Sequence, residues 1–387
     1  MSSTFVLSCP VPGMDAALGV VAARSYRIVP GGRAAPLPDP VELPREPLYT
    51  ESANRGAGFR FLADAAQMEL GKPLTDVLLF GHAYVPGQGH ATSVETGLEV
   101  GAARKSVRAI GPRRIEVTAA GLKLTEPEPF QKVPLTADLA YGGRDRYAEK
   151  LLYSRTGTRK PREMELAPPF QLLYPRNAAG RGYFIDMDRD RIHGAPAPCL
   201  EDPTDPITAD RLLSKSATDW IDRPVAASYE PIDIVTFPRC CHFIRPAFDE
   251  PKRTVHELST GAVLREDLHK PLDLKAPRNP RVFNCAPSGL SMSLLGGGER
   301  VKLWNLHRSR SALELDLPDD EPRLLIDVPG VGERAVEARL GTIRIEPDSD
   351  RVTLFWSGFM QVAAIYPNEL TATIRSVAVW RRSGASG

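Results

Sequence analysis

Proline and glycine interrupt this chain so often that long regular elements are disfavoured. The 387 residues include 36 prolines and 31 glycines, which end helices and strands or place the backbone in turns. Such frequent interruption favours many short strands joined by long connections. The densest case is residues 30–47, where six prolines predict an extended segment that wraps over the surface.

The composition is that of a folded, soluble protein. Hydrophobic residues make up 42% of the chain and charged residues 25%, both ordinary for a globular protein, and the length predicts two or three domains or one large β-rich body. The 49 basic and 48 acidic residues nearly cancel, so no excess charge favours nucleic acid or an acidic membrane. We find no signal-peptide pattern and no apolar run of about 18 residues, and we expect a cytoplasmic protein without membrane insertion.

The first strand-rich region is residues 73–150. The stretch 75–86, TDVLLFGHAYVP, is apolar on both alternating faces and predicts a strand buried on both sides. A hairpin is expected around residues 102–104, and two short strands around the glycine turn within 114–125. These patterns predict a β-meander.

The second strand-rich region is residues 286–387. Leu313, Leu315 and Leu317 alternate with acidic residues, and turns then recur every eight to twelve residues, as in antiparallel sandwiches and barrels. The last apolar stretch before the tail fits either a strand or a short helix.

The remaining segments are expected to be irregular. Residues 1–72 form an N-terminal segment with the proline-rich wrap, and residues 151–285 form a loop-rich middle region in which only 208–221, with Thr208 as N-cap, predicts a helix. The predicted fold is mainly β, with antiparallel sandwich- or barrel-like lobes, long ordered loops and few short helices.

Three adjacent residues, Cys240, Cys241 and His242, are the first candidates for chemistry. Neighbouring side chains on a strand point to opposite faces, and the spacing is not that of a zinc site, so buried structural cysteines are the simpler interpretation. A thiol- or metal-dependent hydrolase that uses Cys241 and His242 is kept as an alternative. The odd total of five cysteines argues against a disulfide framework.

Other polar motifs also favour structure over catalysis. His82 and His90 have no identifiable third metal ligand, and His82 is expected to be a hydrogen-bonded core residue. The prolines around Asp202 favour turn geometry. Because we find no catalytic set, we expect a protein that is not an enzyme and that holds no cofactor or metal.

The segment PFQKVPLTADLAYGG, residues 129–143, combines two prolines with a terminal glycine pair. It holds no nucleophile, and its prolines keep it extended. Phe130 and Leu135 are expected to anchor it to the first strand-rich region, while Gly142 and Gly143 permit a backbone turn. We predict that this segment, called the strap below, pins the middle region onto a sheet.

Several motifs follow one another along the chain in a fixed order. They are GHAYVPG (81–87), the strap, YPRNAAGRGY, CLEDPTDPI, FNCAPSGLSMSLLGGGERVKLWNLH and RVTLFWSG. This order resembles one bacterial family, the domain of unknown function family 2169. The resemblance covers about residues 20–360 and is most specific at Pro129-Phe130, Pro134-Leu135 and 140–143. Two departures are Asn177-Ala178-Ala179-Gly180, where the family shows a proline after Asn, and Trp356-Ser357-Gly358, where it shows Arg after Trp.

The resemblance implies an adaptor or chaperone that binds a type VI secretion effector in the cytoplasm and helps to load it onto the VgrG/PAAR spike. A structural component that stays on the secreted spike is the other alternative. Hot spots of protein interfaces are enriched in Trp and Tyr, so the candidate contact residues are Tyr141, Tyr174, Tyr183 and Trp304. Within the shared motifs, structural roles are expected for His82, Pro86, Phe130, Pro134, Gly142, Gly143, Asn177 and Asp202. The sequence leaves the bound effector and the oligomeric state open.

Overall fold

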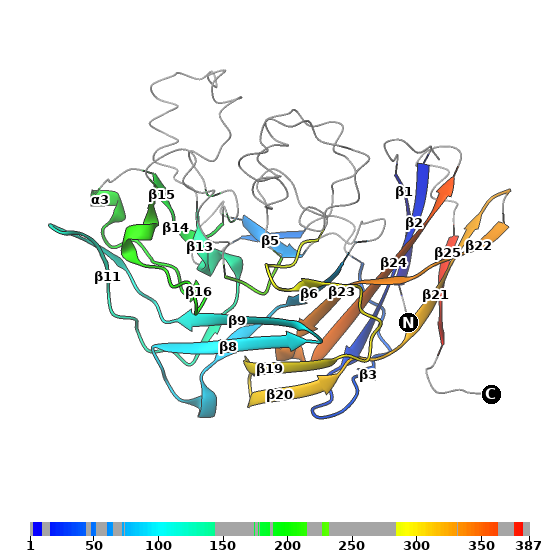
Figure 1. Cartoon of the computed structure of the whole chain (residues 1–387), viewed down its shortest axis with the longest axis horizontal. Helices are drawn as coiled ribbons and strands as arrows, with labels where there is room; N and C mark the ends of the chain where they lie inside the picture. Colours follow the sequence, from blue (N-terminus) through cyan, green and yellow to red (C-terminus); the bar gives the residue numbers. More distant parts are fainter. Residues whose placement is uncertain are drawn as a thin grey trace, which may run out of the picture.

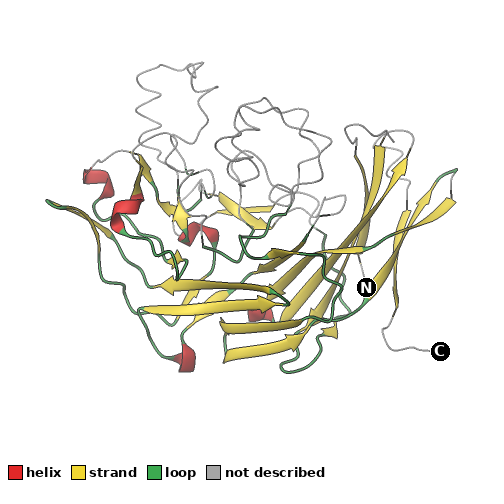
Figure 2. Cartoon of the chain, in the orientation of Figure 1, coloured by secondary structure: helices red, strands yellow, loops and turns green. Residues whose placement is uncertain are grey.

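The structure, a computed structural model, is mainly β, as Figure 2 shows. It describes residues 3–9, 16–43, 48–51, 60–64, 72, 74–143, 174, 177, 179–185, 189–214, 227–231, 284–330, 332–362 and 375–381. The predicted fold class is therefore confirmed. Each of the sheets that these residues form is open, with no closed barrel among them.

The largest sheet has seven strands and brings the two ends of the chain together. Its order is β1-β2-β24-β23-β6-β18, with β3 added to β2 (Figure 1). All neighbours are antiparallel except β23 and β6, which run parallel. The strands are β1 (Ser3–Cys9), β2 (Ala16–Arg27), β3 (Ala35–Pro36), β6 (Thr75–Leu79), β18 (Ser291–Met292), β23 (Arg339–Glu346) and β24 (Arg351–Val362).

A second sheet of five antiparallel strands has the order β16-β9-β8-β19-β20. A third sheet, near the C-terminal end of the chain, has the order β22-β21-β25 and is also antiparallel. The strands of the second sheet are β8 (Ser93–Val100), β9 (Ala103–Ile110), β16 (Leu200–Glu201), β19 (Arg300–His307) and β20 (Arg310–Asp316). Those of the third are β21 (Glu321–Val328), β22 (Gly332–Val336) and β25 (Arg375–Arg381).

The remaining elements are short. The two-stranded pairs are β4 (Leu48–Glu51) with β5 (Arg60–Asp64), β7 (His82–Tyr84) with β12 (Lys132–Pro134), β10 (Ile115–Thr118) with β11 (Gly121–Leu124), β13 (Tyr141–Gly142) with β14 (Arg181–Gly182), and β15 (Phe184–Ile185) with β17 (Leu213–Ser214). The helical turns are η1 (Pro86–Gln88), η2 (Ala137–Leu139), α3 (Arg189–Ile192), η4 (Ala209–Leu212) and η8 (Pro347–Ser349).

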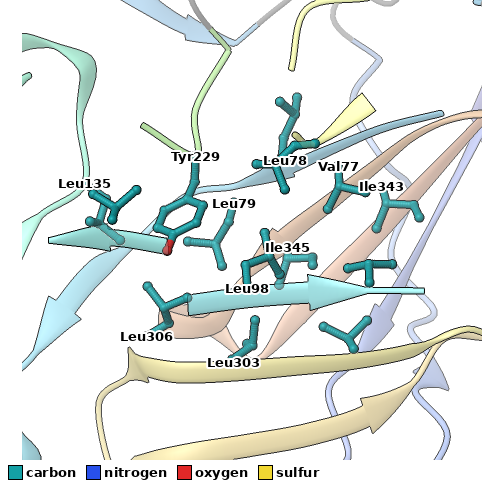
Figure 3. Close-up of a cluster of buried hydrophobic side chains, with 14 of the residues drawn as sticks. Val77, Leu78, Leu79, Leu98, Leu135, Tyr229, Leu303, Leu306, Ile343 and Ile345 are labelled. Carbon is teal, nitrogen blue, oxygen red and sulfur yellow. The ribbon is translucent and has the colours of Figure 1, made fainter. Parts of the chain in front are cut away.

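The main core lies between the seven-stranded and five-stranded sheets. Val77, Ile343 and Ile345 from the first sheet lie across from Leu98 and Leu303 of the second, and all five side chains are almost completely buried (Figure 3). The three residues 77–79 are all buried, as their pattern predicts. The two strand-rich regions of the sequence therefore share one core, since β6 pairs with β23 and β8 pairs with β19.

Most local patterns agree with the structure. The hairpin of β8 and β9 turns at Gly101, and Leu313, Leu315 and Leu317 are all buried. The helix predicted over 208–221 is wrong in its described part. One 3₁₀ turn at 209–212 is followed directly by the strand β17 at residues 213–214. Thr208 occupies the N-cap position but makes no side-chain cap bond.

A buried ion pair fixes the start of β6. The Lys72 Nζ atom lies 2.7 Å from Asp76 Oδ2, with side-chain exposures of 2% and 0%, and it also donates to Thr342 Oγ1 at 2.8 Å. Asp76 further accepts hydrogen bonds from the Cys285 backbone N–H at 2.9 Å and from Ser291 Oγ at 2.8 Å. Burial alone would raise the pKa of Asp76, but Lys72 and these hydrogen bonds outweigh it and lower that pKa.

We expect Lys72→Met to reduce the free energy of unfolding by about 3–5 kcal/mol, because Asp76 then stays buried without its counter-charge. Urea unfolding measures the change. The matched control is Lys302→Met, which removes an ion pair with Glu99 at 3.8 Å on the surface and should cost less than about 1 kcal/mol. Equal losses for the two variants would contradict the structural role of the buried pair.

Candidate functional site

The strap, residues 129–143, lies against the main core through backbone pairing. Its strand β12 pairs with β7, and Phe130 exchanges two backbone hydrogen bonds with Ala91, at 2.9 and 3.1 Å. Farther along, the Leu135 N–H donates to the Gly81 carbonyl at 3.0 Å. Phe130 and Leu135 are buried in the main core. The strap therefore packs on the sheets as an extended segment up to Leu135, and the single 3₁₀ turn η2 follows at Ala137–Leu139.

Asn177 closes the far end of the strap. Its Nδ2 atom donates to the Ala137 carbonyl at 2.7 Å and to the Tyr141 carbonyl at 3.1 Å, and its backbone carbonyl accepts from the Gly143 N–H at 2.9 Å. Gly142 has φ +151°, and a Cβ built on it would lie 2.1 Å from the Asn177 carbonyl oxygen. No residue with a side chain fits at 142 while this contact persists.

Three of the predicted contact residues lie inside the molecule. Tyr141, Tyr174 and Tyr183 are 2%, 0% and 3% exposed, and their rings pack on one another with centroid distances of 5.1 to 6.5 Å. They form a separate small core with Ile115 and Ile192. The expectation that they contact a partner needs correction, because the turn closed by Asn177 directs these rings inward and leaves almost no ring surface to solvent.

The fourth predicted contact residue, Trp304, lies on the outer face of the five-stranded sheet and is only partly buried. Its ring covers Gly97, where a Cβ atom would lie 2.7 Å from Trp304 Cε3. Ala312 is opposite Trp304 on β20, and Ser106 is opposite Gly97 on β9. We call these four residues the Trp304 face: an aromatic ring on a sheet surface whose neighbours in the same cross-strand row are all small.

The backbone at Trp304 is irregular. The register of β19 with β20 shifts between Trp304 and His307, and Asn305 has φ +55°. The Asn305 Nδ2 atom donates to the Glu95 carbonyl at 2.9 Å, which holds this conformation. Bulges of this kind change the direction of a side chain and are frequent beside functional sites.

Charges next to the Trp304 face are paired with one another. Glu99 lies 3.3 Å from Arg104 Nε and 3.8 Å from Lys302 Nζ, and the Arg104 guanidinium lies 5.9 Å from the centre of the Trp304 ring. One carboxylate against two cations leaves these three rim residues with a net charge of +1. Among the described residues, the Trp304 Nε1–H has no protein acceptor, so its donor remains available to a bound molecule.

The residues with predicted structural roles in the remaining motifs make local contacts. His82 Nδ1 lies 2.7 Å from Asp348 Oδ2, although the His82 side chain is 32% exposed and so lies at the edge of the core. Pro86 begins the turn η1, and Pro134 lies in β12. Asp202 Oδ1 accepts from the backbone N–H of Thr204 at 2.8 Å and from its hydroxyl at 2.7 Å, a local turn.

Residues Cys240, Cys241 and His242 lie outside the described residues, so the hydrolase alternative stays a prediction. The described cysteines Cys199 and Cys285 are buried and are not joined to another described cysteine by a disulfide. Within the part of the chain that the structure describes, no group of three or more His, Cys, Asp or Glu side chains is placed to hold a metal ion. The same part contains no helix that is long and apolar enough to span a membrane.

Sequence reasoning missed one buried acid beneath the strap, Glu230. It is 5% exposed, and its Oε2 atom accepts from the Ala137 N–H at 3.1 Å. Burial raises the pKa of Glu230 to about 8, and the neighbouring Asp138 adds to the shift, while the Ala137 N–H and Arg344 oppose it. Nothing in the local sequence SYEP distinguishes this acid from a surface residue.

Comparison with known proteins identifies one family. A family model described as "Uncharacterized protein conserved in bacteria (DUF2169)" matches residues 14–357. The match covers the first strand-rich region, the strap, the Trp304 face and the second strand-rich region as far as residue 357. No curated protein and no solved structure matches the chain.

Gly142→Val is expected to lower the free energy of unfolding by about 3 kcal/mol or more, because it combines strain at positive φ with a clash against backbone. The control is Gly121→Val, since Gly121 has φ +126° but open space around it. Thermal unfolding compares the two. Unchanged melting together with lost partner binding would instead make the strap a contact surface.

Glu230→Gln is expected to stabilise the protein increasingly as pH rises from about 4.5 to 8. In this window the unfolded chain ionises Glu230 while the folded chain keeps it protonated, so wild-type stability falls with pH by at most about 1.4 kcal/mol per unit. Because a Gln side chain does not ionise in this range, the free energy of unfolding of the variant loses this dependence on pH. Denaturant unfolding at pH 5 and pH 8 tests it, and a gain that is equal at both values would contradict the prediction.

Glu201→Gln is expected to have the opposite effect on stability from Glu230→Gln. Glu201 is a buried acid that lies 3.3 Å from both Arg108 and Arg113. Loss of these ion pairs should destabilise the protein.

Proposed function

The chain belongs to the DUF2169 family of bacterial proteins, and from this premise we propose that it is a non-enzymatic adaptor for type VI secretion. It binds an effector protein in the cytoplasm and helps to load it onto the VgrG/PAAR spike. The mechanism is surface complementarity, without a chemical step.

The observation that carries this proposal is the Trp304 face. Trp is the residue most typical of interface hot spots, which sit at the centre of a patch and are surrounded by contacts that exclude water. Here the flanking positions are Gly97, Ser106 and Ala312, and such small residues allow a partner to approach the ring closely. The Nε1–H offers one directional hydrogen bond to the partner, and the net positive rim favours a partner with an acidic group at its edge.

The rigidity of the platform also supports binding. Leu98 and Leu303, the residues next to Gly97 and Trp304, point into the main core and are 0% and 1% exposed. The ring therefore stands on a sheet that is fixed from below. A pre-organised surface loses less conformational entropy on binding than a loop does.

We expect Trp304→Ala to weaken binding of the effector encoded beside the gene by about 2 kcal/mol, roughly thirtyfold in Kd. Calorimetry with the purified chain and effector measures it. The control is Phe359→Ala. Phe359 is an aromatic residue that is 39% exposed on β24 of the seven-stranded sheet, and this variant should bind the effector as tightly as the wild type does. Circular dichroism checks that both variants fold.

Two results would count against the proposal. Equal affinities for the wild type and Trp304→Ala would remove the Trp304 face as the docking surface. Unaltered effector abundance and secretion after deletion of the gene would overturn the adaptor function itself. Recovery of the chain with VgrG from culture supernatant would favour the alternative of a component carried on the spike.

A further inference from the structure

β20 is the outermost strand of the five-stranded sheet, and it lies directly beside the strand that carries Trp304 (Figure 1). A strand in this position directs half of its backbone N–H and C=O groups away from the sheet. These groups bond either to water or to another segment of chain. The edge of β20 that faces away from β19 therefore determines what can be added next to the Trp304 face.

One end of this edge is already covered by the chain itself. The Glu314 carbonyl accepts a hydrogen bond from the Gly31 N–H at 2.7 Å, and Asp316 exchanges hydrogen bonds with Gly32 and Ala34 at 3.0 and 2.9 Å. The segment that contains the glycines thus extends the sheet for a short distance. These bonds also show which way the strand faces, because residues 314 and 316 use backbone groups that point outward.

The next residue in this alternation, Ala312, has an open edge. Every second residue of a strand directs its backbone groups to the same side, so the N–H and C=O of Ala312 face outward, as does the N–H of Glu314. Within the described part of the chain, none of these three groups has a hydrogen-bond partner. Arg310, Ser311 and Ala312 are all exposed, so a partner can reach the edge at this point.

The side chains at this edge indicate which residues fit opposite them. A strand added here extends the row of the Trp304 face by one position, on the far side of Ala312. Because Ala312 is small, a large apolar side chain at that position can reach across it to the Trp304 ring. Arg310 lies two residues from Ala312 on the same face. It has no acidic partner among the described residues, whereas Arg300 of the same hairpin lies 2.9 Å from Asp316.

We propose that the effector docks by adding a strand to the open edge of β20, with a large apolar side chain opposite Ala312 and an acidic side chain opposite Arg310. This inference rests on the proposed function and specifies the form of the partner. An extended strand can bond to the N–H and C=O of Ala312 in the plane of the sheet. A helix laid on the Trp304 face pairs its own backbone groups internally and offers none to this edge.

Amide hydrogen exchange of the wild-type chain, measured by NMR alone and with the purified effector encoded beside the gene, tests the proposal. The Ala312 and Glu314 amides are expected to exchange rapidly in the free chain. In the complex their exchange should slow about tenfold or more, because they then bond to the partner. The Leu313 and Leu315 amides are the internal control, since they point toward β19 and should be protected in both states.

Ala312→Pro removes the outward N–H and leaves the hydrogen bonds between β19 and β20 in place, because an edge strand accepts proline at such a position. We expect this variant to bind the effector about tenfold or more weakly than the wild type, and thermal unfolding checks that it folds. The matched control Ala312→Ser keeps the N–H and a small side chain and should bind within about twofold of the wild type. Arg310→Glu should also weaken binding, less so at high salt.

Unchanged exchange of the Ala312 and Glu314 amides in the complex would overturn the proposal, as would wild-type affinity of the Ala312→Pro variant. If Trp304→Ala still loses affinity in that case, the adaptor function stands and only the strand addition fails. A wild-type chain that binds no effector overturns both. Protection of these two amides that increases with the concentration of the chain alone would assign the edge to a second copy, which also overturns the proposal.

Discussion

One buried carboxylate, that of Asp76, connects three distant parts of the chain. It forms an ion pair with Lys72, just before β6, and accepts hydrogen bonds from the Cys285 N–H and the Ser291 hydroxyl. Lys72 also donates a hydrogen bond to Thr342, which links the carboxylate indirectly to β23. A charge this deeply buried is tolerated only when all its hydrogen-bonding capacity is used. The cluster therefore joins β6, β23 and β18 within the seven-stranded sheet and ties the segment at residue 285 to it, so this part of the sheet depends on these contacts.

Much of the fold could be predicted from the sequence, because alternation of apolar residues is a local signal. Leu313, Leu315 and Leu317 and the apolar run at 77–79 reveal their own burial. Pairing between strands is not local. Nothing in residues 75–79 indicates that they pair with residues 342–345, so the sequence alone left open whether the two strand-rich regions share one core. The helix expected at 208–221 failed in its described part because a single capping residue and periodicity do not determine a helix when strand pairing competes.

The candidate site could be predicted only in part. Residue type alone singled out Trp304 and the three tyrosines equally. What separates them is the neighbourhood: Trp304 stands on the solvent face of a strand, whereas Asn177 and the glycines of the strap turn the tyrosines inward. The burial of Glu230 and Lys72 could not be predicted, because Glu and Lys are usually exposed and nothing in their local sequence marks these two as exceptions. Only the packing of distant segments around them makes them buried.

The parallel pairing of β23 with β6 has a consequence for biosynthesis. About 265 residues separate Leu79 from Arg344, and a ribosome needs on the order of tens of seconds to add them. Throughout that time β6, whose five residues are all buried in the folded protein, has emerged without the strand that pairs with its edge. The N-terminal half therefore waits for the C-terminal half before the largest sheet can close, and truncated products of translation would expose an unpaired apolar edge that favours aggregation. Rapid assembly of a sheet is favoured when paired strands are made one after the other, whereas β6 and β23 are made far apart in time.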